Sequence, residues 1–216
     1  MIKRFAFYVS GQATRLQKIV ELYPQIMENT FIVINDEGSN PIVEKIVLER
    51  NIPYIEFSYS DKCLKGKDRN DYLSKILLEK LLELNIDFTF CFGSKLLQGD
   101  LLKTYKNRII NFHPAILPMF PGIKAIDNAM KSNSFLLGNT AHFIDDGKDT
   151  GPIIMQSIIQ SSTFTNYEDV LRLQLPMINQ IFNWINEDRI KVHNNIVEIE
   201  KANYNQIIYI PNIENN

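Results

Sequence analysis

Residues 111–156 read NFHPAILPMFPGIKAIDNAMKSNSFLLGNTAHFIDDGKDTGPIIMQ, and the rest of the chain is organised around this stretch. The β-branched run at 108–110 is typical of a buried strand. That strand delivers Asn111 and His113, which are two residues apart and therefore face the same side. The prolines that follow stop the strand, so both side chains should lie where its carboxyl end opens into a loop. Open α/β sheets bind their ligands at that edge.

The second half of the stretch adds carboxylates. An apolar run at 139–144 gives way to the polar, turn-forming residues 145–151, and strand character returns at 152–156. Asp149 falls in this loop. The stretch therefore offers an amide, an imidazole and carboxylates on loops.

The composition favours one α/β domain that acts on small molecules. With 216 residues the chain can bury a full core, so we expect a domain at 1–193 and a short appendage at 194–216. The formal charge is −2, from 23 basic and 25 acidic residues, and no basic stripe stands out. This balance disfavours nucleic acid and anionic membranes as partners.

Other features of the chain are typical of a cytoplasmic protein. The first residues enter a strand without an apolar signal core, and no apolar run approaches membrane-spanning length. Cys63 and Cys91 have neither metal-binding nor redox spacing, which fits a reducing compartment.

Strands and helices alternate along the first half of the chain, which predicts a parallel sheet with right-handed crossovers. We expect the basic segment 62–69 to be a loop and Asn70 to cap the helix after it. The expected strands are 5–10, 31–35, 52–57 and 87–92, and the expected helices are 16–22, 42–50, 70–84 and 98–105.

The turn after the first strand is a candidate anion site. Gly11, Gln12, Ala13 and Thr14 connect the strand to a helix, whose free N–H groups and dipole favour negative charge. Further glycines are missing, so neither a dinucleotide fingerprint nor a P-loop is present. The turn could bind a phosphate or simply connect two elements, and Arg15 could pair with that phosphate or face solvent.

The C-terminal part changes character after a long helix at 166–184, in which Pro176 predicts a kink. Short alternating strands are expected at 189–193, 196–200 and 206–210, with the last two forming a hairpin. A lone hairpin is barely stable in water, so this one should pack on the domain or on a second subunit. We favour a homodimer.

Three motifs resemble those of the folate-dependent formyltransferases. They are NFHPAILP at 111–118, FPGIKA at 120–125, and GNTAH at 138–142 followed by DTGPIIMQ at 149–156. The likeness reaches about residue 193 and implies a Rossmann-like α/β fold with a mostly parallel sheet flanked by helices. It also implies an enzyme that takes 10-formyltetrahydrofolate as co-substrate and needs no metal.

The resemblance further implies roles for residues of this chain. Asn111, His113 and Asp149 would be catalytic, and the Leu117–Pro118 peptide would be cis. Two segments would hold the folate, and they contribute Ser94, Lys95, Leu96, Leu97, Ile144, Asp145 and Asp146.

Formyl transfer needs these three catalytic residue types. When a primary amine attacks the formyl carbon, negative charge grows on the carbonyl oxygen and positive charge grows on nitrogen. Asn111 can donate an N–H to that oxygen, and losing such a donor costs roughly 3 kcal/mol. His113 can donate to the same oxygen or carry the amine's proton to the leaving nitrogen, with Asp149 orienting its ring.

Each of these residues also has a purely structural interpretation. Asn111 alone could end a strand, His113 could be a hydrogen-bonded core imidazole, and Asp149 could cap a turn. Together, in this order and on these loops, they favour function. His142 lies within an apolar strand, so a structural or folate-shaping role is expected. A metal site built from His113, His142 and Asp149 has no supporting motif.

The acceptor amine is predicted from the positions at which this sequence differs from particular members of the family that it resembles. Glycinamide ribonucleotide enzymes carry a loop resembling S-G-x-G-S-N, whereas residues 10–15 read SGQATR. This departure disfavours a ribonucleotide acceptor, and the net charge disfavours tRNA as the acceptor.

Residues 120–129 and the tail resemble bacterial enzymes that formylate dTDP-linked amino sugars for surface polysaccharide, the O-antigen of lipopolysaccharide. We predict a dTDP-amino-dideoxyhexose, such as dTDP-4-amino-4,6-dideoxyglucose, as acceptor. Glycinamide ribonucleotide, or a non-catalytic folate- or nucleotide-binding role, is the alternative.

Overall fold

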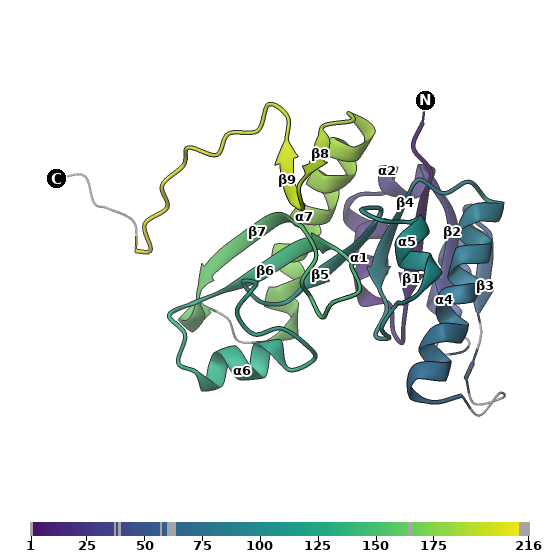
Figure 1. Ribbon diagram of the computed structural model, residues 1–216, viewed down its shortest axis with the longest axis horizontal. Helices are drawn as coiled ribbons and strands as arrows, with labels where there is room; N and C mark the ends of the chain where they lie inside the picture. The colour runs from purple at the N-terminus through teal and green to yellow at the C-terminus, as the bar shows by residue number, and fades with distance from the viewer. Residues whose placement is uncertain are drawn as a thin grey trace.

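A seven-stranded sheet forms the centre of the protein in a computed structural model, which describes residues 2–36, 38, 40–56, 58–59, 64–163 and 166–211 (Figure 1). The strand order is β3-β2-β1-β4-β5-β6-β7. The first five of these strands pair in parallel, and β6 and β7 are added antiparallel, so the sheet is mostly parallel as predicted. The strands are β1 (Phe5–Val9), β2 (Thr30–Asn35), β3 (Tyr54–Glu56), β4 (Phe88–Phe92), β5 (Ile109–His113), β6 (Leu136–Phe143) and β7 (Ile153–Gln160).

Helices cover both faces of the sheet, because successive residues of a strand point to opposite sides. In β1, Phe5 and Phe7 face one core, to which α1, α2, α3 and α7 contribute, whereas Ala6 and Tyr8 face a second core under α4 and α5. The helices are α1 (Thr14–Leu22), α2 (Gln25–Glu28), α3 (Pro41–Leu48), α4 (Gly66–Glu83), α5 (Asp100–Thr104), α6 (Ala125–Lys131) and α7 (Tyr167–Asn186). Among the described helices, none combines the length and apolarity needed to cross a bilayer.

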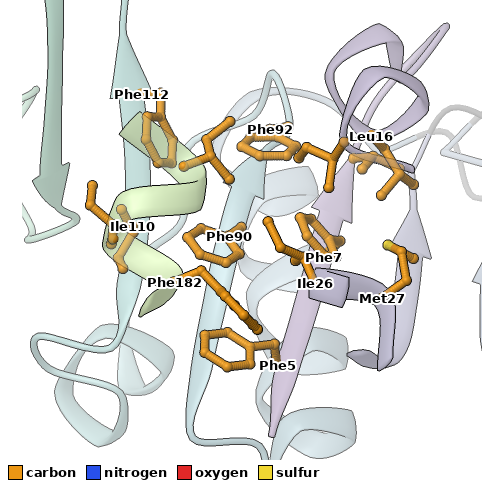
Figure 2. Close-up of a cluster of buried hydrophobic side chains, with 14 of the residues drawn as sticks. Phe5, Phe7, Leu16, Ile26, Met27, Phe90, Phe92, Ile110, Phe112 and Phe182 are labelled. Carbon is orange, nitrogen blue, oxygen red and sulfur yellow. The ribbon is translucent and has the colours of Figure 1, made fainter. Parts of the chain in front are cut away.

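Aromatic rings fill the first core (Figure 2). The parallel strands β1 and β4 place Phe7 opposite Phe90, with ring centroids 5.4 Å apart. Phe5 lies 5.6 Å from Phe90 and 4.8 Å from Phe182 of α7. This packing ties α7 to the middle strands, whose carboxyl ends carry the polar residues discussed below.

The start of α4 corrects one expectation. The segment 62–69 was expected to be a loop ending at an Asn70 cap, but α4 begins at Gly66, and Asn70 is buried within its second turn. Asp68 lies in the first turn, where a carboxylate is favoured by the helix dipole. Residues 62 and 63 lie outside the described part of the chain.

The C-terminal hairpin also differs from its expected pairing. It joins β8 (Ile190–His193) to β9 (Ile196–Ile199), rather than 196–200 to 206–210. Asn194 and Asn195 connect the strands with φ values of 49° and 66°, as a two-residue turn of type I′ requires. Ile199 is buried against the first core, so the hairpin packs on its own domain. The expected appendage 194–216 thus holds one of the hairpin's two strands.

Candidate functional site

A cleft of about 290 Å³ lies beside the carboxyl ends of β4 and β5. Asn111 and His113 enter it from β5, and Asp149 enters it from the loop after β6. The three predicted catalytic residues are therefore brought to one cleft, although Asp149 is far from the other two in the sequence. Predicted folate residues also line it, namely Ser94, Lys95, Leu96, Leu97, Ile144 and Asp145, whereas Asp146 is not among its lining residues.

Both ring nitrogens of His113 face oxygen atoms. Its Nε2 lies 2.9 Å from the carbonyl oxygen of Phe120, and because a carbonyl only accepts, Nε2 carries the hydrogen. Nδ1 lies 3.4 Å from Oδ2 of Asp149. The residue is 4% exposed, so the imidazole has little freedom to turn.

The Asp149 carboxylate is fixed by backbone geometry. Its own φ is 56°, and the N–H of Gly122 donates to Oδ2 across 2.7 Å. The loop before it is closed by Asp145, whose Oδ1 accepts from the N–H of Gly147 (3.1 Å) and the hydroxyl of Thr150 (2.9 Å). These bonds hold Asp149 over His113.

His142 is a member of this cluster that the residue patterns did not assign to the catalytic set. Strand register places it directly opposite Asn111, and its Nε2 lies 3.3 Å from Nδ2 of Asn111. The same Nε2 lies 3.7 Å from Oδ1 of Asp149. Burial lowers the pKa of His142 below its ordinary value, with a smaller contribution from His113, while the Phe143 carbonyl and Asp149 oppose that shift.

No signal in the sequence alone pairs His142 with Asn111, because the pairing depends on the register of β5 against β6. The structural role expected for His142 is compatible with its burial. Within the described residues, His113, His142 and Asp149 do not form a group able to hold a metal ion.

A second hollow, of about 190 Å³, lies over the first turn of α1. Ala13 has a φ of 50° and no side chain caps the helix, whose first turn also lacks acidic residues. Of the predicted substrate residues, Gln12, Ala13, Thr14 and Arg15 line this hollow, whereas Gly11 does not. The carbonyl of Gly11 instead accepts from Asn40 at 2.7 Å.

Arg15 joins the two cavities, because it lines both. Its guanidinium carbon lies 4.8 Å above the ring of Phe92, and its NH1 lies 3.5 Å from Oε1 of Gln174. The cation therefore lies against an aromatic ring where the cleft meets the hollow over the first turn of α1.

A buried carboxylate is linked by hydrogen bonds to the segment that was predicted to hold the folate. Asp36 is fully buried at the end of β2, and it accepts from Tyr8 (2.8 Å), Tyr59 (2.9 Å) and Ser10 (2.5 Å). Burial, and then Asp36, raises the pKa of Tyr8 well above its ordinary value, so Tyr8 remains a donor. The Ser10 hydroxyl in turn accepts from the N–H of Ser94 at 3.0 Å. The network thereby ties the start of the predicted folate segment, at Ser94, to β1 and β2.

The chain matches known proteins over most of its length. Residues 3–173 match the model of a family described as formyl transferase. Phosphoribosylglycinamide formyltransferase of Bacillus subtilis (strain 168) is 30% identical over 174 residues, which cover 78% of this chain and 85% of that protein. Formyltetrahydrofolate deformylase of Haemophilus influenzae is 29% identical over 203 residues, covering 89% and 69%. The crystal structure of glycinamide ribonucleotide transformylase 1 from Symbiobacterium toebii confirms the predicted fold, with a TM-score of 0.76 at 24% identity, covering 92% of this chain and 94% of that chain.

Proposed function

Because the chain belongs to the formyl transferase family, whose members are folate-dependent enzymes that take 10-formyltetrahydrofolate as co-substrate, we propose that it moves a formyl group onto an amine in the cleft at Asn111. The observation that carries this proposal is the meeting of an amide, an imidazole and a carboxylate, from two separate segments, around one cleft. This set suits acyl transfer, which needs a donor for the oxyanion and a path for one proton.

In the proposed reaction, the acceptor's uncharged amine attacks the formyl carbon. A new C–N bond forms, and the developing oxyanion receives an N–H from Asn111. His113 and Asp149, which lie 3.4 Å apart, carry the proton that the amine loses to the folate nitrogen. The bond from the formyl carbon to that nitrogen then breaks, which yields a formamide and tetrahydrofolate.

We propose a dTDP-linked amino-dideoxy sugar, such as dTDP-4-amino-4,6-dideoxyglucose, as the acceptor, with its product used for surface polysaccharide. Two features next to the cleft support a diphosphate. The uncapped first turn of α1 offers N–H groups to one phosphate, and Arg15 offers a guanidinium to the next. Residues 10–15 also lack the second glycine and the asparagine of the ribonucleotide loop.

Two alternative acceptors of the formyl group must be tested beside the sugar nucleotide. The name of the Bacillus subtilis relative favours phosphoribosylglycinamide as acceptor, and that of the Haemophilus influenzae relative favours water, which would release formate. Either reaction would take place in the same cleft of this chain, beside Asn111, His113 and Asp149. The acceptor therefore has to be decided by assay.

The test incubates the purified protein and 10-formyltetrahydrofolate with the sugar nucleotide, with glycinamide ribonucleotide, or with no amine. Tetrahydrofolate is followed by absorbance, the formamide by mass spectrometry and formate by enzymatic assay. Formylated sugar supports the proposal, and turnover of the ribonucleotide alone would replace the acceptor. Formate release without amine would indicate deformylation. Asn111→Ala and His113→Ala are the matched variants, and equal rates in all three proteins would remove the catalytic roles.

A homodimer remains part of the proposal. The hairpin packs on its own domain, so we propose that residues 200–211 after β9, which lead away from the sheet, contact the second copy (Figure 1). Ile207 and Ile208 in this segment are 76% and 67% exposed. Strand β7 ends the sheet and carries no charged side chain to protect its edge. Light scattering of the full chain and of a chain ending at Ala202 tests this, because a dimer held by the segment becomes a monomer on truncation.

A further inference from the structure

We infer that His142 is a positioning residue, whose neutral ring holds the amide of Asn111 so that one N–H of that amide points at the reacting carbonyl. The inference rests on the proposed formyl transfer, and it assigns to a buried strand residue a role that no motif indicated. It is carried by three observations on β5 and β6, which are the tautomer of the ring, the distance to Asn111 and the burial of the pair.

The tautomer follows from the partner of Nδ1. This nitrogen lies 2.9 Å from the carbonyl oxygen of Phe143, and a carbonyl oxygen can only accept a hydrogen bond. Nδ1 therefore carries the hydrogen of the neutral ring. Its Nε2 then presents a lone pair, and can only accept.

That lone pair decides the orientation of the Asn111 amide. The amide group is 3.3 Å from Nε2, and the atom facing an acceptor must be the nitrogen rather than the oxygen. One N–H of Asn111 is thus engaged by His142. The second N–H of the same nitrogen remains for the formyl oxygen, and its direction is set by the first.

Burial and surrounding charges keep this arrangement in place. His142 is 2% exposed, and its pKa is lowered mainly by burial, with His113 adding to the shift. The Phe143 carbonyl and the carboxylates of Asp149 and Asp145 act in the opposite direction. The ring is therefore neutral around pH 7. Acid would protonate Nε2, which would then donate toward Oδ1 of Asp149, 3.7 Å away, and release Asn111.

The activity test is a double-mutant cycle with a conservative variant. We expect His142→Ala to lower kcat about 10- to 100-fold in the wild-type background, in line with an uncompensated buried hydrogen bond. In Asn111→Ala the same change should cost less than about threefold, because the group being positioned is gone. His142→Gln places an amide oxygen where Nε2 lies in the wild type, so this variant should retain most of the wild-type kcat. Because that oxygen does not become protonated, kcat should fall less on acidification than it does in the wild type. An equal loss in both backgrounds would overturn the inference.

A second measurement separates the inference from the proposed function. Nitrogen chemical shifts of the His142 ring, recorded on the free protein at neutral pH, report the tautomer without any turnover. We expect a protonated Nδ1 and an unprotonated, hydrogen-bonded Nε2, whose shift moves in Asn111→Ala. A ring protonated at Nε2, or an Nε2 shift indifferent to Asn111→Ala, would overturn the inference even in an active enzyme. An inactive protein with the expected shifts would instead reject formyl transfer alone.

Discussion

Replacing Gly122 by alanine tests whether the backbone that anchors Asp149 is needed for the reaction. Gly122 has a φ of +90°, and its N–H donates to Oδ2 of Asp149 at 2.7 Å. A side chain with this φ is strained by about 1–2 kcal/mol. Relief requires the peptide to rotate, and this rotation moves the N–H away from the carboxylate.

The expected loss of kcat in Gly122→Ala follows from the strength of the hydrogen bond between the Gly122 N–H and the Asp149 carboxylate. A hydrogen bond to a charged group contributes about 1.5–3 kcal/mol, so its loss from the active arrangement should lower kcat roughly 10- to 150-fold. The strain is small beside a typical folding free energy of about 5–15 kcal/mol, and Gly122→Ala should therefore stay folded. Tetrahydrofolate release gives kcat, and thermal unfolding gives the stability.

Lys148 supplies the matched control. A Cβ at Gly122 would overlap Cε and Nζ of Lys148, at the flexible end of an exposed side chain that can move aside. Lys148 also lines the cleft, so Lys148→Ala alone gives the reference rate, and adding it to Gly122→Ala should not restore activity to that reference. Wild-type kcat in Gly122→Ala would refute the role of the anchored carboxylate. Recovery in the double variant would assign the loss to crowding rather than to φ.

Three further predictions concern stability. Tyr8→Phe removes a donor from the buried carboxylate of Asp36 and should lower the free energy of urea unfolding by about 1–3 kcal/mol, with a smaller loss for the more exposed Tyr59→Phe. Phe90→Ala empties the centre of the aromatic core and should cost about 3–5 kcal/mol in the same assay. The pKa of His142 is lowered in the folded protein from its ordinary value of 6.5. Below about pH 6.5 the unfolded chain therefore binds more protons than the folded protein, and the free energy of unfolding should fall as the pH drops. His142→Gln should reduce this dependence, and an unchanged pH profile would contradict it.

Several parts of the fold follow from local patterns in the sequence. Alternating strands and helices in the first half of the chain predict a parallel sheet, because a helix that crosses back over the sheet returns the chain to the end where the previous strand began. The spacing of Asn111 and His113 places both on one face of a strand, and the prolines after them end that strand at the cleft. These inferences succeed because they depend on residues close together in the chain.

Helix and hairpin boundaries were predicted less well, for local reasons. The charge of the run before Asn70 predicts a loop, but a helix with one buried face tolerates charged residues on the other face, and α4 begins at Gly66. The predicted hairpin pairing, 196–200 with 206–210, is wrong because the tight turn lies at Asn194–Asn195 and joins β8 to β9. Positive φ at two successive asparagines settled which strands meet.

The sequence by itself determined the layered fold, the family and the three residue types that the reaction needs. Only the tertiary structure decided that Asp149 lies against His113, that Gly122 anchors Asp149, and that His142 faces Asn111. The physical reason is that strand register and loop closure bring together groups that are distant in the chain. Such contacts depend on the packing of the whole sheet, and no local periodicity records them.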